Sequence, residues 1–198
     1  MTRELIIATK NHKKLYELRR YLKGIKAVVV SLAEIGKAPF IREDGDTFKE
    51  NAVKKAVTIS RFTKGLVLAD DSGLEVNALG GSPGVRSARF AGSGKKDLDN
   101  NTKLLNILEG VPLKKRTARF VAAVAIADNG KVVKLVEGYC KGQIAFSIRG
   151  SRGFGYDSVF LPIGYKNTFG ELGLKVKDKI SHRSKALEKA RDFLRKYI

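Results

Sequence analysis

Two adjacent carboxylates carry the clearest chemical signal in the sequence. The stretch LADDSGLEV (residues 68–76) places Asp70 and Asp71 side by side after a short apolar run. Asp, Ser and Gly are all turn residues, so a turn is the simplest interpretation. It explains the doubled aspartate poorly, because like charges repel unless a cation lies near them. Carboxylate oxygens suit Mg²⁺, and a carboxylate beside a bound ion can orient or deprotonate a water, so the pair also predicts metal-assisted hydrolysis.

A second candidate is ATKNHKKLYEL (residues 8–18), where a strand runs through a short turn into a helix. Backbone N–H groups at the start of that helix, with the Thr9 hydroxyl and the Asn11 amide, could bind an anion. Lys14, one turn into the helix, could reach a phosphate as a point charge. The alternative is that Asn11 only caps the helix and that Lys14 lies in solvent, since Asn is a preferred cap. The sequence leaves both interpretations open.

The stretch REDGDTFKENAVKKA (residues 42–56) joins an acidic loop to the start of a helix. Thr47 and Glu50 have the spacing of a capping box, so we expect the helix to begin at Thr47 and assign Glu50 to the cap. Glu43 lies in the acidic loop just before the helix, and Lys55 lies two turns along it. Lys55 could face a phosphate, although a polar loop and a solvated helix face are the simpler interpretation.

Aromatic and basic side chains gather in two later stretches, RGFGYDSVF (152–160) and KDKISHRSKAL (177–187). Phe154 and Tyr156, held among glycines, could offer a ring face to a nucleobase. His182 and Arg183 follow Ser181, a predicted N-cap, and so occupy the first turn of the last helix. An arginine there opposes the helix dipole, which suggests a role beyond stability, and a donor-only group suits an oxo substituent or a phosphate. The alternative is a surface arginine and a solvent-facing histidine.

Taken together, these stretches supply phosphate donors, an acid pair for a metal, ring faces and a donor for an oxo group. That combination predicts a nucleoside triphosphate as the ligand. The elements that must position these side chains are strands over 4–8, 28–32 and 65–70 and helices over 12–22, 47–62, 96–110 and 181–197. A hairpin over 116–145 turns at Asp128-Asn129-Gly130. Helices mixed with strands, without strict βαβ alternation, predict an α/β fold with a mixed sheet in one domain and without internal repeats.

Composition narrows the class of protein. The chain has 198 residues, 43% of them hydrophobic, and no apolar run approaches the roughly 20 residues that span a bilayer. A single cysteine, Cys140, cannot form an internal disulfide, so we predict a cytoplasmic protein. A net charge of +19 attracts polyanions. The basic residues are dispersed among acids and aromatics make up only 8%, so charge alone does not support nucleic-acid binding.

The sequence resembles the Ham1-like inosine triphosphate pyrophosphatases, which remove the non-canonical purine nucleotides ITP, dITP and XTP. The matching stretches follow the order of that family and cover nearly the whole chain: ATKNHKK, EDGDTFKENAVKKA, ADDSGLEVNALGGSPGVRSARF, EGYCKGQI, GFGYDSVF, NTFGEL and KDKISHRSKAL. The resemblance implies one elongated α/β domain over residues 1–198, with a long mixed sheet flanked by helices and two lobes around an active-site cleft. It also implies a homodimer, with no membrane and no stable nucleic-acid partner.

The resemblance further implies site roles. Asp71 would accept the proton of the attacking water, and Glu43, Asp71 and Asp70 would contact Mg²⁺. The residues it places at the substrate are Thr9, Lys10, Asn11, His12, Lys13 and Lys14 in the substrate loop, Lys55, Ser72 and Lys177 at phosphate or sugar, and Phe154, Gly155, Tyr156, Asp157, His182 and Arg183 at the base. The implied reaction is NTP + H₂O → NMP + PPi. A donor such as Arg183 at the purine 6-oxo group would disfavour ATP, which carries an amino group there.

Three residues depart from the usual pattern of the family: Lys10 replaces a common Gly, Ser158 a common Pro and Arg86 a common Tyr. None removes a catalytic group, so we expect activity, with kinetics and substrate preference open to change. Two alternatives remain. One is a Maf-like pyrophosphatase with another base preference. The other is a basic nucleic-acid-binding protein without catalysis, which predicts salt-dependent binding and no Mg²⁺-dependent release of pyrophosphate.

Overall fold

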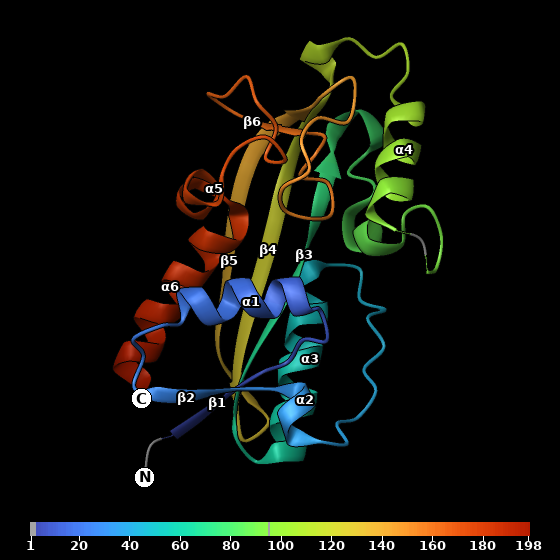
Figure 1. The fold of residues 1–198 in the computed structure, drawn as a ribbon. Helices are drawn as coiled ribbons and strands as arrows, with labels where there is room; N and C mark the ends of the chain where they lie inside the picture. The colour runs from blue at the N-terminus through green and yellow to red at the C-terminus, as the bar shows by residue number, and fades with distance from the viewer. Residues whose placement is uncertain (1–2, 95) are drawn as a thin grey trace. The chain divides into compact units, whose positions relative to one another are not determined.

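The computed structural model describes residues 3–94 and 96–198, and its strands form one six-stranded sheet (Figure 1). The strand order is β2-β1-β3-β4-β5-β6. Strand β1 runs parallel to both β2 and β3, whereas β5 and β6 are antiparallel. The predicted mixed sheet is therefore confirmed. The strands are β1 Arg3–Ile7, β2 Ala27–Ser31, β3 Leu66–Val76, β4 Thr117–Asp128, β5 Lys131–Ile144 and β6 Phe160–Pro162.

Helices account for much of the remaining chain, so the predicted α/β class is confirmed. They are α1 His12–Tyr21, α2 Leu32–Ile35, α3 Phe48–Thr63, α4 Asp97–Ile107, α5 Leu174–Ile180 and α6 His182–Tyr197, with 3₁₀ turns at Asn77–Leu79, Gly84–Arg89 and Leu113–Lys115. The sequence predicted α1, α3, α4 and α6. It missed the short helices α2 and α5. Within the described ranges, no helix is both long and apolar enough to cross a membrane.

Local signals set the ends of several elements as predicted. Thr47 caps α3, since its hydroxyl accepts from Glu50 N at 3.1 Å while the Glu50 carboxylate accepts from Thr47 N at 3.2 Å. Glu50 therefore serves the cap, as predicted. The β4–β5 hairpin turns at Asn129 and Gly130, whose φ angles of 47° and 79° are both positive. That pair suits the primed turn that matches the twist of the flanking strands.

By backbone contacts the described chain divides into two compact units, each with its own apolar core. Unit 1 comprises residues 1–71, 122–138 and 183–198, and unit 2 comprises residues 72–121 and 139–182. The core of unit 1 joins Leu5, Ile7, Leu66 and Leu68 to buried leucines of α1 and α6. The core of unit 2 is more aromatic and includes Phe120, Tyr156, Phe160 and Phe169.

Strand β3 corrects one prediction. The sequence predicted that this strand ends at Asp70, with a turn as the simplest interpretation of the residues that follow, but the strand continues to Val76. Leu74 and Val76 are both fully buried, so the apolar alternation that resumes after the two aspartates belongs to the same strand. The turn interpretation is therefore wrong, and both aspartates lie within the sheet.

Candidate functional site

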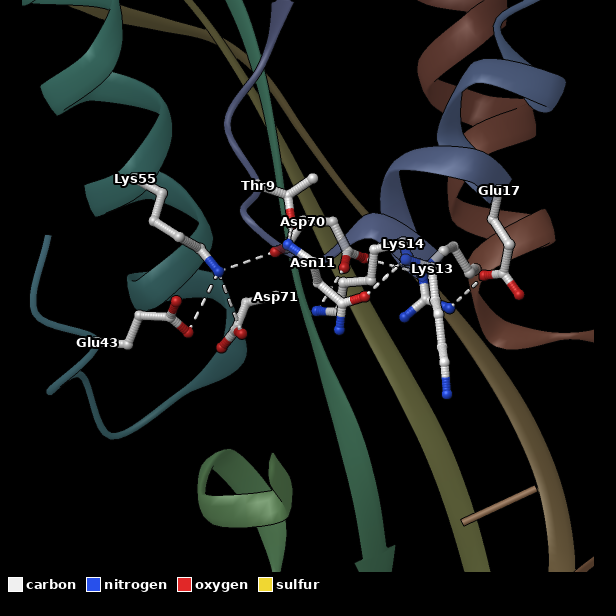
Figure 2. A network of polar contacts seen from close by, with 10 residues as sticks. Thr9, Asn11, Lys13, Lys14, Glu17, Glu43, Lys55, Asp70 and Asp71 are labelled. Carbon is white, nitrogen blue, oxygen red and sulfur yellow. Dashed lines mark hydrogen bonds and ion pairs between the residues drawn. The ribbon is translucent and has the colours of Figure 1, made fainter. Parts of the chain in front are cut away.

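The strand geometry of β3 points the two aspartates to opposite faces of the sheet. Neighbouring side chains alternate across a strand, so Asp70 lies on the same face as Leu66 and Leu68. That is the face on which α1 and α6 pack in unit 1. Asp71 points the other way, toward Lys55 of α3, as Figure 2 shows. Like charges that are neighbours in sequence thus have separate surroundings.

On the Asp70 face, four charged side chains are linked in a chain of ion pairs. Asp70 Oδ2 lies 2.8 Å from Lys14 Nζ (Figure 2). Asp70 Oδ1 lies 3.6 Å from Arg183 Nε. Arg183 Nη1 donates to Glu17 Oε2 at 2.6 Å, and Glu17 lies one turn after Lys14 on α1. Burial alone would raise the pKa of Asp70, but the charges of Lys14 and Arg183 outweigh it and hold that pKa well below its usual value.

On the Asp71 face, one buried ammonium serves two carboxylates. Lys55 Nζ lies 3.3 Å from Asp71 Oδ1 and 3.3 Å from Glu43 Oε2, and it donates to the backbone oxygen of Asp70 at 2.9 Å (Figure 2). Asp71 Oδ2 is buried and has no hydrogen-bond partner within the described residues. Burial raises the pKa of Asp71; Lys55 and Lys14 oppose the rise, while the charges of Glu43 and Asp70 add to it. This carboxylate is poorly compensated and protonates more readily than an ordinary aspartate.

The donor set on the Asp71 face fits Mg²⁺. Glu43 and Asp71 both reach the same cationic nitrogen, so both lie within reach of one cation, and Asp71 Oδ2 is a buried oxygen with its acceptor capacity unused. Residues 3–94 and 96–198 contain no group of three or more His, Cys, Asp or Glu side chains arranged for a metal ion. Mg²⁺ commonly takes one or two carboxylates and completes its shell with water and phosphate oxygens. Asp70, predicted as a further contact, faces the opposite side of the sheet.

The turn before α1 is organised by Asn11. Its Oδ1 accepts from Lys13 N at 2.9 Å and from Lys14 N at 3.1 Å, while Thr9 Oγ1 accepts from Asn11 N at 3.2 Å. Asn11 therefore caps the helix, as the simpler of the two sequence interpretations predicted. Lys14, however, is paired with Asp70 rather than extended into solvent. The other predicted residues of this loop, Lys10, His12 and Lys13, are exposed.

In unit 2, the predicted base loop is held by a buried ion pair. Asp157 Oδ2 accepts from Lys177 Nζ at 2.6 Å and from Phe154 N at 2.8 Å. Lys177 Nζ also lies 4.7 Å from the centre of the Phe154 ring. Asp157 and Lys177 are both buried, whereas Phe154 is only half-buried. Phe154 is therefore the ring of this loop best placed to meet a ligand.

Two further predicted residues lie in the aromatic core of unit 2. Tyr156 is buried and its hydroxyl donates to Ser87 O at 2.9 Å; burial, with a smaller contribution from Asp97, raises its pKa. His182 is buried and stacks on Phe120, with ring centres 4.6 Å apart and planes 12° apart. Ser72, the first residue of unit 2, is half-buried.

Three side chains that contact predicted site residues were not predicted from the sequence: Glu17 of α1, and Asp97 and Asn101 of α4. Glu17 is buried on an otherwise basic helix and is the hydrogen-bond partner of Arg183, 166 residues away in the chain. Its spacing from Lys14 was the available signal, since helix residues three apart lie on one face. Asp97 and Asn101 contact the base loop at Gly155, four residues apart on one helix.

Comparison with known proteins identifies the family. The sequence model of the Ham1 family matches residues 5–193. This chain belongs to the Ham1 family. A curated relative from Desulforamulus reducens, named dITP/XTP pyrophosphatase, is 50% identical over 196 residues, covering 98% of each chain. A relative of the same name from Bacillus subtilis is 46% identical and covers 94% of each chain. The predicted resemblance is confirmed.

Solved structures of Ham1 proteins share the fold. A HAM1 protein from Coxiella burnetii superposes with a TM-score of 0.89 at 36% identity and covers 96% of this chain and 98% of its own. The Ham1 protein of Staphylococcus aureus gives a TM-score of 0.89 at 35% identity, with 98% of this chain and 100% of its own covered. This chain and the solved Ham1 proteins therefore share one fold over almost their entire lengths.

Proposed function

We propose that the chain is a Mg²⁺-dependent pyrophosphohydrolase that converts dITP, XTP and ITP to the monophosphate and pyrophosphate. Its curated relatives named dITP/XTP pyrophosphatase match over nearly the full length, which supports the reaction class and the substrates. The observation that carries the proposal is the buried, poorly compensated carboxylate of Asp71 beside Lys55 and Glu43. That arrangement suits the activation of a water next to a phosphate chain.

Asp71 is the proposed general base. Water attacks the α-phosphorus, the water proton passes to the Asp71 carboxylate, and the bond to the pyrophosphate leaving group breaks. A raised pKa makes this carboxylate a better proton acceptor near neutral pH than an ordinary aspartate. Lys55 fixes its orientation through Asp71 Oδ1. Mg²⁺ held by Glu43 and Asp71 would neutralise the charge that develops on the leaving pyrophosphate.

The basic surface supplies capture of the substrate. The triphosphate carries about four negative charges, and a chain with a net charge of +19 attracts it over a long range. The exposed Lys10, His12 and Lys13 at the start of α1 are the proposed local contacts for phosphate. Lys14 and Lys55 act mainly through the carboxylates that they hold in place.

Base selection needs a donor at the purine 6-oxo group, because adenine presents an amino donor there instead. Glu17 and Asp70 hold the guanidinium of Arg183 in one orientation, which suits a group that reads one atom. In unit 2, the half-buried Phe154 offers a ring face for stacking. A site built on such a hydrogen bond rejects a substrate that lacks the partner by roughly 10⁴-fold.

The test is a substrate panel. Pyrophosphate release is measured from dITP, XTP, ITP, ATP and GTP, with Mg²⁺ and with EDTA, and with Asp71→Asn protein as the blank for a contaminating enzyme. We expect Mg²⁺-dependent release from the first three and little from ATP. Preference for modified pyrimidine or canonical nucleotides would favour a Maf-like pyrophosphatase. Salt-sensitive DNA or RNA binding without any pyrophosphate release would favour the nucleic-acid-binding alternative.

A homodimer and a cytoplasmic location remain predictions that accompany this function. Sedimentation equilibrium at several protein concentrations tests the first, and fractionation of cells of the source organism tests the second. A monomer at micromolar concentration with full activity would separate the catalytic proposal from the dimer prediction.

A further inference from the structure

Within unit 2, α4 holds one residue of the base loop by both of its backbone groups. Gly155 N donates to Asp97 Oδ2 at 2.8 Å, and Gly155 O accepts from Asn101 Nδ2 at 2.9 Å. Asp97 and Asn101 are four residues apart, so both side chains project from one face of α4. Gly155 is the residue between Phe154 and Tyr156, at the centre of the loop that we assign to the base.

The conformation of Gly155 explains why such a hold is needed. Its φ is +63°, in the left-handed region that non-glycine residues rarely adopt. A Cβ built on it would meet nothing within 4 Å, so glycine is required here by its φ angle and not by a close neighbour. Backbone flexibility is greatest at a glycine, and the two contacts from α4 restrain both backbone polar groups of this one.

The burial of Asn101 is energetically unfavourable, which also indicates a role beyond stability. The residue is 3% exposed, and its Nδ2 also lies 3.4 Å from Ser158 Oγ. Its Oδ1 is buried and has no hydrogen-bond partner in the part of the chain that the structure describes. A buried acceptor left unmet is unfavourable, so a residue serving only stability is poorly explained at this position.

We propose that Asp97 and Asn101 are positioning residues for base selection, which fix Gly155 and thereby the placement of the Phe154 ring. The inference rests on the proposed function and extends it to residues that touch neither the base nor the phosphates. Asp157 and Lys177 hold the other end of the loop through their ion pair. The α4 contacts then determine the backbone between that ion pair and the ring.

The experiment compares variants of α4 in the full-length protein. Asp97→Ala and Asn101→Ala remove the two contacts, while Asp97→Asn keeps an oxygen acceptor for Gly155 N. The matched control is Asp99→Ala, because Asp99 is also an acid of the first turn of α4, and its Oδ2 accepts from Lys96 N at 2.8 Å rather than from the loop. The readouts are kcat/KM for dITP relative to dATP, the midpoint of thermal unfolding, and hydrogen exchange of the Gly155 amide.

We expect Asp97→Ala and Asn101→Ala to lower the dITP-to-dATP ratio by about tenfold to a hundredfold, since small misplacements of a positioning group have effects of that order. Gly155 should exchange faster in Asp97→Ala, and Asp97→Asn should recover most of the ratio. Asp99→Ala should lower the unfolding midpoint without changing the ratio. An unchanged ratio in both alanine variants, or an equal loss in Asp99→Ala, overturns the inference. Wild-type protein that fails to prefer dITP overturns the proposed function instead.

Discussion

The two faces of β3 treat neighbouring aspartates in opposite ways. On one face, Asp70 and Glu17 meet Lys14 and Arg183, so two anions are balanced by two cations. On the other face, Asp71 and Glu43 both contact the ammonium of Lys55. The first arrangement lowers the pKa of Asp70, and the second leaves the pKa of Asp71 raised.

The difference separates a structural role from a chemical one. A buried carboxylate that is fully compensated gains nothing by binding a further cation or a proton. One that is under-compensated gains from either, which is the property required of a metal ligand and of a general base. Two consecutive residues of β3 can hold these two roles, because alternation sends neighbouring side chains to opposite faces of the sheet.

The largest effect should come from Asp71→Asn. The substitution keeps the size of the side chain and removes the proton acceptor, so kcat for dITP should fall by roughly 10²–10⁴-fold. Because the charge removed is one that the fold compensates poorly, the free energy of unfolding should be equal to or higher than that of the wild type. Steady-state kinetics and urea denaturation measure the two quantities on the same preparation. Wild-type turnover in this variant would remove Asp71 from the mechanism.

Asp70→Asn should lower the stability of the fold, unlike Asp71→Asn. It leaves the half-buried Lys14 and the buried Arg183 beside a neutral amide, and removing one partner of a buried charge network typically costs about 3–5 kcal/mol. The free energy of unfolding should therefore fall by about that amount. A variant as stable as the wild type in urea denaturation at pH 7 would show that the ion pairs of Asp70 do not stabilise the fold.

Glu17 provides a finer test of the same network. Glu17→Ala removes the hydrogen-bond partner of Arg183 but leaves Asp70 in place, so we expect a loss of about 1–3 kcal/mol in the free energy of unfolding. Glu17→Gln keeps an acceptor oxygen and should lose less. If Glu17 also orients Arg183 for base selection, the alanine variant should lower the ratio of kcat/KM for ITP to kcat/KM for ATP. Equal stability of the alanine and glutamine variants would contradict the role of this contact.

Local signals made part of the fold predictable. The capping box of Thr47 and Glu50 and the Asn-Gly turn at 129–130 depend on residues close in sequence, and both were found. The full length of β3 was not, because Asp, Ser and Gly each favour turns and their long-range partners are invisible in a local pattern. The strand in fact continues to Val76, and Leu74 and Val76 pack into the core of unit 2.

The candidate site was predictable as a set of residues but not as an arrangement. The acid pair was recognised, yet the sequence treated Asp70 and Asp71 as one charged cluster, because the strand was expected to end between them. The buried partner of Arg183 was missed, since α1 and α6 lie at opposite ends of the chain. Contacts between such distant segments follow from the fold, and a single sequence contains no direct signal for them.

The smallest predicted effect is a dependence of stability on pH that distinguishes the two aspartates. An unfolded aspartate has a pKa of about 3.9, and the pKa of Asp71 in the folded protein is higher. The folded state therefore binds this proton more tightly, so the stabilisation it gives is complete below about pH 3.9 and is lost as pH rises through the folded pKa. The stability of Asp71→Asn relative to the wild type should increase over that window and then level off.

Asp70 should show the opposite dependence, because its folded pKa is lowered. The stabilisation by its ion pairs is present above about pH 3.9 and is lost on further acidification, so the difference in stability between the wild type and Asp70→Asn should shrink in acid. Urea denaturation of the three proteins between pH 3 and pH 8 measures both trends, and parallel curves for Asp71→Asn and the wild type would contradict the raised pKa on which the proposed base depends.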